Sequence, residues 1–153
     1  ITMPLSHARR FMDEALALAK AAAEAGEVPV GALIVKAGVI IGRGANRPLL
    51  SRDPTAHAEI IAIREAAEFL GNDRLTDCDL CVTLEPCAMC AGAIAHARIS
   101  RLYYGASDPK GGAVEHGPRL FDQPTVHHWP QVYGGIAEDE AGALLRQFFA
   151  SRR

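Results

Sequence analysis

The sequence predicts one three-layer α/β domain, and its length, its composition and the order of its helical and strand patterns all indicate this. The chain has 153 residues, which suits a single domain with one sizeable core, and we take residues 1–153 as that domain. Apolar residues make up 49% and charged residues 22%, as in ordinary soluble globular proteins. Helical and strand patterns alternate, with a strand–helix–strand crossover around Cys87, so helices are expected on both faces of a sheet.

The first half of the chain predicts a helix, a hairpin and a second helix. Apolar residues recur at three- and four-residue steps over 6–25, which indicates an amphipathic helix capped by Ser6. Two short β-branched runs, 30–35 and 39–42, are separated by three residues and predict a hairpin. After a loop that contains two prolines, a second helix is expected over 56–71.

The second half predicts two further strands and two further helices. A strand is expected over 80–84, and Pro86 suits the first position of the helix that follows, because a proline lacks an N–H that would have no partner there. That helix continues over 88–97 and leads to a strand over 99–104. The C-terminal apolar pattern predicts a last helix over 137–150.

The segment 105–131 has no clear period and contains four prolines and four glycines. An irregular connection of this length in a compact domain is usually functional or disordered. We therefore expect this segment to be either functional or disordered.

The chain shows no candidate membrane or secretory segment. Its most apolar helical run, 15–25, is interrupted by Lys20 and Glu24 and is shorter than the ~18 apolar residues of a spanning helix. We therefore expect a cytoplasmic protein with no membrane partner. In such a reducing compartment, four cysteines indicate metal binding more than disulfides.

Three side chains have the types and spacing of a zinc site. Cys87 and Cys90 are three residues apart at a predicted helix start, so both thiols project from one face. His57 lies at the start of the other predicted helix and would be the third ligand. Catalytic zinc sites use three imidazole, thiolate or carboxylate ligands and leave the fourth position to water. The sequence therefore predicts one Zn²⁺ per chain.

Glu59 follows His57 by two residues, so both can begin the same helix while only one of them binds the metal. A carboxylate beside a zinc-activated water can take its proton and deliver it elsewhere. The structural alternative is a negative charge that favours a helix N-terminus. The combined pattern H-x-E…P-C-x-x-C is the signature of zinc nucleobase deaminases. It predicts that Glu59 is the catalytic acid–base group.

A second Cys-x-x-Cys pair, Cys78 and Cys81, precedes Cys87 by only six residues and leaves two alternatives open. All four cysteines could form a structural zinc site, although the pairs of such sites are usually separated by about 15–20 residues. A redox role for Cys87 and Cys90 would leave His57 without a function. Residues three apart on a strand face opposite sides, so we expect the earlier pair to be small buried side chains.

With these motifs in place, the chain resembles the bacterial tRNA adenosine deaminases of the cytidine deaminase superfamily over about residues 7–153. The zinc motif alone indicates only the superfamily, whereas the Asp53-Pro54-Thr55 lead-in and the segment after Gly105 favour the tRNA branch. The stretches that carry the resemblance are 27–32, 46–48, 53–59, 82–93, 98–99, 104–106, 108, 110–113, 144–145 and 148–149.

The resemblance implies a helix-flanked sheet of about five strands, a homodimer, and conversion of the wobble adenosine of an arginine tRNA to inosine in the anticodon stem-loop. It implies that Asn46 and the backbone at Ala58 contact the flipped nucleoside. The pocket would be lined by Val30, Leu84 and Pro86, and flanking nucleotides would be touched by Asp108, Lys110, His127 and His128.

The net charge of −2 gives no global signal for nucleic acid, so RNA binding would depend on scattered basic side chains. The candidates are Arg98, Arg101, Lys110, Arg119, Arg146, Arg152 and Arg153. Two other functions stay open at this point. The same zinc chemistry could deaminate a free base or nucleoside such as guanine or cytosine, and a noncatalytic zinc-binding interaction module would need the metal but not Glu59.

Overall fold

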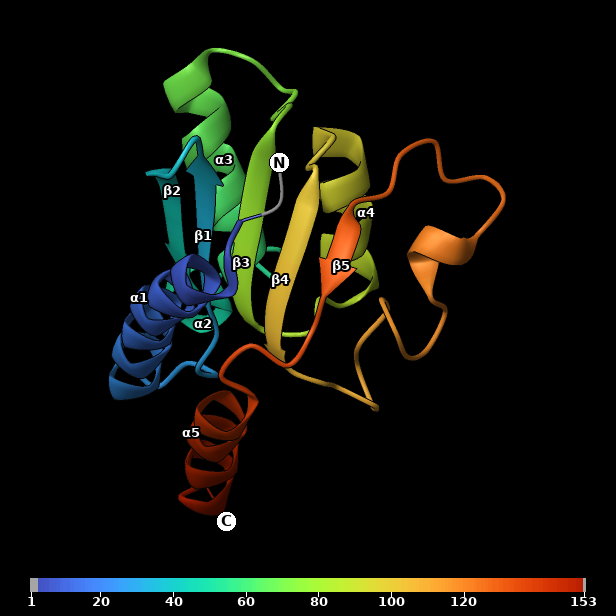
Figure 1. The fold of residues 1–153 in the computed structure, drawn as a ribbon. Helices are drawn as coiled ribbons and strands as arrows, with labels where there is room; N and C mark the ends of the chain where they lie inside the picture. Colours follow the sequence, from blue (N-terminus) through green and yellow to red (C-terminus); the bar gives the residue numbers. More distant parts are fainter. Residues whose placement is uncertain (1–2, 153) are drawn as a thin grey trace.

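A five-stranded mixed sheet forms the centre of the molecule, with helices on both of its faces (Figure 1). The computed structural model describes residues 3–152. The strands are β1 (Gly31–Lys36), β2 (Val39–Ala45), β3 (Cys78–Leu84), β4 (Arg101–Ala106) and β5 (Gln131–Tyr133). Their order across the sheet is β2-β1-β3-β4-β5; β1 is antiparallel to both of its neighbours, and β3, β4 and β5 are parallel. The predicted three-layer α/β architecture is confirmed.

The helices divide between the two faces of the sheet. They are α1 (Leu5–Glu24), α2 (Pro48–Ser51), α3 (Ala58–Leu70), α4 (Ala88–Ala97) and α5 (Glu138–Ala150), with a short 3₁₀ turn at Leu120–Asp122. Alanines of α3 and α4 pack on one face in a cluster that includes Ile34 and Leu80. Phe11 and Met12 of α1 and Ala141 of α5 pack on the other face with Leu33. None of the helices over residues 3–152 is long and apolar enough to cross a membrane.

The four predicted helix starts were wrong by one or two residues; α3 begins at Ala58 rather than at 56, and α5 begins at Glu138 rather than at 137. The first helix begins at Leu5, and Pro4 rather than Ser6 is its N-cap. The Pro4 carbonyl already accepts hydrogen bonds from the N–H groups of His7 and Ala8, each at 3.0 Å, so Ser6 lies inside the first turn. Pro86 precedes α4 instead of opening it, because Cys87 has an extended backbone and is the N-cap.

Two short elements inside the predicted loops were not expected from the sequence. The strand β5 has only three residues, and it pairs in parallel with β4 at the edge of the sheet. Helix α2 has four residues, and its first N–H groups bond to the buried carboxylate of Glu27. Both elements depend on partners distant in sequence, which local periodicity does not reveal.

Glycines allow α3 to lie very close to β2. A Cβ atom at Gly44 would be 2.1 Å from the carbonyl oxygen of Ala58, and one at Gly42 would be 2.3 Å from that of Ala62. These distances are far below any ordinary contact, so only glycine fits at either position. The two glycines thereby place the first turn of α3, which follows His57, directly over the sheet.

Candidate metal centre and substrate pocket

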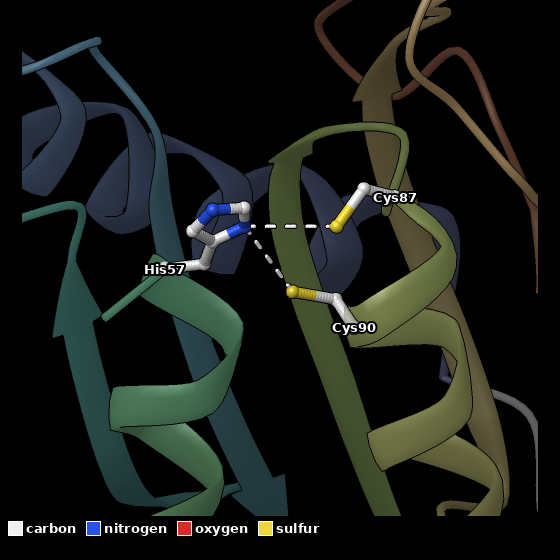
Figure 2. A group of neighbouring side chains, drawn as sticks. All are labelled: His57, Cys87 and Cys90. Carbon is white, nitrogen blue, oxygen red and sulfur yellow. Dashed lines mark hydrogen bonds between the residues drawn. The ribbon is translucent and has the colours of Figure 1, made fainter. Parts of the chain in front are cut away.

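His57, Cys87 and Cys90 converge on one point between the starts of α3 and α4 (Figure 2). The Nδ1 atom of His57 lies 3.6 Å from the Sγ atom of Cys87 and 3.6 Å from the Sγ atom of Cys90. All three potential donor atoms lie within 4.8 Å of one another. Two segments that are thirty residues apart in sequence are therefore joined at the metal centre.

The two helix starts bring these ligands together because two of the metal-binding residues occupy capping positions and the third, Cys90, lies in the first turn of α4. His57 is the N-cap of α3 and Cys87 is the N-cap of α4, and neither side chain caps its helix by a hydrogen bond. Their carbonyls accept the first helical bonds, from Ile61 at 3.1 Å and from Ala91 at 2.8 Å. An N-cap residue has an extended backbone, so its side chain is free to project beyond the helix end.

The donor set fits Zn²⁺ in both chemistry and spacing. Tetrahedral zinc with Zn–N bonds of about 2.05 Å and Zn–S bonds of about 2.3 Å would separate nitrogen from sulfur by about 3.6 Å. The two measured Nδ1–Sγ distances have this value. One imidazole and two thiolates leave one tetrahedral position for a ligand other than protein, which is the pattern of a catalytic site rather than a structural one.

The pKa values of the two thiols are shifted in opposite directions. Hydrogen bonds from Cys90 and from His57 hold the pKa of the Cys87 thiol well below its usual range, against the opposing effect of burial. The pKa of Cys90 is raised, because its thiol donates to Cys87 and lies in a buried position. The hydrogen bond with Cys87 raises the pKa of His57. Zinc binding would displace the remaining thiol proton, since only thiolates are metal ligands.

Glu59 lies beside the metal centre, in the first turn of α3, and is only 4% exposed. Its carboxylate interacts electrostatically with His57, Cys87 and Cys90, which places it within reach of the donor set. Burial raises the pKa of the Glu59 carboxyl to about 7. A bound Zn²⁺ would lower this pKa, because a nearby positive charge favours the carboxylate.

A cavity of about 230 Å³ opens onto the metal centre. Its lining residues are Val28, Val30, Asn46, His57, Glu59, Leu84, Glu85, Cys87, Asp108 and Gly111. Pockets for drug-sized ligands usually measure about 300–1,000 Å³, so this cavity suits a smaller ligand such as one nucleobase. The valines and Leu84 supply apolar walls, while the Asn46 amide and the carboxylates supply polar groups.

Residues 5–106 match the family model described as the cytidine and deoxycytidylate deaminase zinc-binding region. This match covers more than half of the chain and includes every residue of the metal centre. The protein belongs to this deaminase family. Its metal centre is therefore the zinc site of the family, built from His57, Cys87 and Cys90.

Individual relatives of this deaminase have more specific names. A tRNA-specific adenosine deaminase of Agrobacterium fabrum is 59% identical over 143 residues, covering 94% of each chain. A solved structure from work on A-to-I editing by tRNA:A34 deaminases is 58% identical with a TM-score of 0.88, covering 89% of this chain and 99% of that one. The guanine deaminase of Bacillus subtilis is 38% identical with a TM-score of 0.64, covering 94% of this chain and 92% of that one.

The structure of this deaminase brings some of the expected substrate residues to the pocket and leaves others away from it. Val30, Asn46, Leu84 and Asp108 line the cavity. Ala58 and Pro86 do not line it; the Ala58 side chain is fully buried against the sheet. Lys110 is exposed in the segment just after Asp108.

His127 and His128 line a different cavity, along the C-terminal half of α4. Arg98, the C-cap of α4, lines this cavity with them. His128 also bonds through Nε2 to the carbonyl oxygen of Ile99 at 2.6 Å. The metal centre lies at the opposite end of the same helix, so the two histidines are separate from it.

The cysteine pair Cys78 and Cys81 takes no part in the metal centre, and the four-cysteine zinc site is wrong. Both side chains are fully buried in β3, where one packs in the α3–α4 cluster and the other in the α1–α5 cluster on the opposite face. Within residues 3–152, the set of His57, Cys87 and Cys90 is the single group able to hold a metal. The expected small buried role of the pair is confirmed.

Several of the basic candidates for RNA contact already have acidic partners. Arg101 pairs with the buried Asp79, and Arg119 pairs with Asp122 at 2.9 Å. Arg153 lies outside the described residues. Lys110 is exposed in the chain between the pocket residues Asp108 and Gly111.

Four residues of the site were missed by the sequence analysis. Val28, Glu85 and Gly111 line the cavity, and Glu27 is buried beneath α2. The glutamates could have been noticed, because each interrupts an apolar stretch that precedes a pocket residue. Acidic residues are almost never fully buried without partners. A glutamate among apolar residues in the sequence therefore indicates a buried carboxylate with hydrogen-bonding partners.

Proposed function

We propose that this protein is a hydrolase that deaminates adenosine to inosine at the wobble position of a tRNA anticodon loop, with one zinc ion per chain. The observation that carries the deamination is the buried Glu59, which lines one cavity with His57 and Cys87 of the three-residue donor set. The tRNA substrate is supported by the 59% identity to the tRNA-specific adenosine deaminase of Agrobacterium fabrum.

In this reaction water replaces the amino group of the base, and ammonia leaves. Zinc held by the three ligands would supply the Lewis acid that makes water nucleophilic near neutral pH. Glu59 takes a proton from the attacking water, delivers it to a ring nitrogen, and then passes a proton to the departing amine. Its burial and its place beside the donor set suit a group that moves protons without exchanging them with bulk solvent.

The cavity would bind the base between apolar side chains and orient it by a few polar groups. Val30 and Leu84 form apolar walls, and the Asn46 amide is only 9% exposed at the cavity. Backbone groups at Ala58, which follows the cavity residue His57 in the chain, would complete the recognition. A base inside a duplex cannot reach such a pocket, so an unstacked base in a loop is bound at lower cost.

The proposal extends to the surroundings of the pocket. Asp108, Lys110, His127 and His128 would contact nucleotides that flank the target. The chain would act as one domain over 1–153, as a homodimer in the cytoplasm, on an arginine tRNA. These features are supported by the resemblance of the motifs and by the high identity to tRNA-specific relatives.

A free-base deaminase is the second candidate, and the 38% identity to the guanine deaminase of Bacillus subtilis favours it over a noncatalytic module. The decisive experiment offers the zinc-loaded protein a tRNA anticodon stem-loop and, in parallel, free guanine, cytosine and adenosine. We expect inosine in the stem-loop and no comparable ammonia release from the free compounds. Efficient release from guanine with no inosine in the stem-loop would contradict the tRNA assignment.

A further inference from the structure

Glu85 is a fully buried carboxylate for which the deamination chemistry described above has no use. Its side chain has 0% exposure, although it follows the last residue of β3 directly and lines the pocket. Its own N–H donates to the carbonyl oxygen of Ala106 at 2.9 Å, which fixes its backbone at the edge of the parallel strands. A buried acid in such a place needs several hydrogen bonds to offset its lost hydration.

Those hydrogen bonds all come from one segment, 108–116, which has no regular secondary structure. The Oε1 atom of Glu85 accepts from the N–H of Asp108 at 3.0 Å and bonds to the His116 Nδ1 atom at 2.7 Å. The Oε2 atom accepts from three consecutive N–H groups, those of Val114 at 3.2 Å, Glu115 at 2.9 Å and His116 at 3.1 Å. One side chain thus holds both ends of the segment.

The segment is folded tightly around this carboxylate. A Cβ atom at Gly112 would be 2.6 Å from Cδ of Glu85 and 2.5 Å from the carbonyl oxygen of Asp108, so a side chain at this position has no room. Within the segment, Oδ1 of Asp108 accepts from the N–H groups of Lys110 at 3.3 Å and Gly111 at 2.9 Å. This turn presents Asp108 and Gly111 to the pocket.

We propose that Glu85 is a positioning residue for substrate specificity, holding the 108–116 segment so that Asp108 and Gly111 form one wall of the pocket. The proposal rests on the proposed function, because it assigns this wall to recognition of the substrate around the target base. Glu85 does not touch the reacting atoms in this role. It acts through Asp108 and Gly111, whereas Glu59 and the metal ligands lie at the starts of α3 and α4.

A carboxylate is required here and an amide cannot replace it. An ionised carboxylate only accepts hydrogen bonds, so it suits a position surrounded by four backbone N–H donors and the His116 ring nitrogen. A glutamine has the same size but turns an NH₂ group toward one set of N–H donors. Glu85→Gln therefore changes the hydrogen-bonding polarity of the site with almost no change in volume, which makes it the sharpest test.

Hydrogen exchange of the zinc-loaded full chain tests the proposal without any substrate. In Glu85→Gln we expect the amides of Asp108, Val114, Glu115 and His116 to exchange at least about tenfold faster, because hydrogen bonds to a charged acceptor are lost. Amides in the β3 strand should not change. The matched control is Glu115→Gln, whose exposed carboxylate pairs with the Tyr104 hydroxyl and receives no backbone bond of the segment. Unchanged exchange over 108–116 in Glu85→Gln would overturn the proposal.

Kinetics on the anticodon stem-loop then distinguish a role of Glu85 in positioning the pocket wall from a role in supporting α4, the helix that carries Cys87 and Cys90 at its start. We expect KM to rise about tenfold in Glu85→Gln, with kcat within about threefold and zinc content unchanged, because the lost contacts serve binding rather than the chemical step. In an Asp108→Ala background the same substitution should add little, since both act through one wall. Additive effects, or lost zinc with unchanged KM, would overturn the role assigned to Glu85.

If Glu85→Gln fails to fold, His116 supplies the second pair of variants. His116→Ala should produce smaller changes in the same direction, and His116→Asn should restore near-normal exchange, because its amide can donate from about the position of Nδ1. Equal exchange in the two variants would count against the proposal. The exchange measurements need no active substrate, so a wild-type protein that forms no inosine would contradict the proposed function and leave this test intact.

Discussion

The two walls of the pocket are built in different ways. On one side, Glu59 follows His57 in the first turn of α3, a helix pressed onto the glycines of β2. On the other side, Asp108 and Gly111 belong to an irregular segment held by a single buried carboxylate, Glu85. The first wall depends on regular secondary structure, whereas the second depends on a few hydrogen bonds to one side chain.

The first wall therefore holds the groups that react, and the second holds the groups that select the substrate. Ligand and proton-transfer atoms need placement within a fraction of an ångström, which helices and strands provide better than loops. Recognition of what surrounds the base can reside in a segment that changes without disturbing the metal centre. Relatives named as tRNA deaminases and as guanine deaminases share the sheet and helices of this chain, which is consistent with such a division.

On the wall that carries Glu59 and His57, the largest effect on activity is expected from loss of the metal. Cys87→Ala should lose zinc and all measurable deamination, because two remaining ligands cannot hold a catalytic zinc. Cys81→Ala is the matched control, since this thiol is buried on the opposite face of the sheet. Metal analysis of the two purified variants checks the prediction; equal zinc loss in both would show that the cysteine pairs act together.

Removal of the proton carrier should be the next largest effect. Glu59→Gln should retain zinc and fold but lose turnover by ~10²–10⁴-fold, the usual contribution of a positioned acid–base group. Glu68→Gln, on the exposed side of the same helix, is the control and should have normal kinetics. Single-turnover rates measured alongside metal content decide the matter, and normal turnover of zinc-loaded Glu59→Gln would revive a noncatalytic role.

The buried Glu59 should also destabilise the metal-free protein at neutral and higher pH. Burial raises the pKa of Glu59 to about 7, so the folded state holds a proton that the unfolded chain releases near its usual pKa. Folded protein therefore loses stability as pH rises from that value through 7. At pH 8, chelated Glu59→Gln should exceed chelated wild type in free energy of unfolding by an amount on the order of 1–3 kcal/mol. At pH 4 the difference should vanish, and denaturant titrations at both pH values test this.

The smallest effect is expected on RNA binding, from a residue of the irregular 108–116 segment. Lys110→Ala should weaken stem-loop binding a few-fold and reduce the salt slope by about 0.7, the value for one phosphate contact on a single strand. Lys20→Ala removes an exposed lysine from α1, on the other face of the sheet, and should leave both quantities unchanged. Binding titrations at several salt concentrations provide the measurement, and identical slopes for the two variants would place the RNA elsewhere.

The sequence alone predicted the residues of the metal centre, but it did not predict how the segment that forms the opposite wall of the pocket is held. His57, Glu59 and the cysteine pair are recognisable because metal chemistry fixes residue types and spacing, and the helices that carry them are periodic. The three residues of β5 have no such pattern, since the neighbouring β4 alone makes them a strand. Glu85 was visible only as an acid in an apolar stretch, because its partners lie twenty or more residues downstream.

The close approach of α3 to β2 also makes the metal centre adjustable from outside the pocket. A methyl group at Gly44 would have to move the carbonyl of Ala58 by about an ångström to reach an acceptable contact. Metal–ligand distances tolerate only about 0.2 Å, so a displacement of this size next to His57 would disturb the zinc site. A single carbon atom added in the sheet, outside the pocket, would therefore weaken the hold of the protein on its metal.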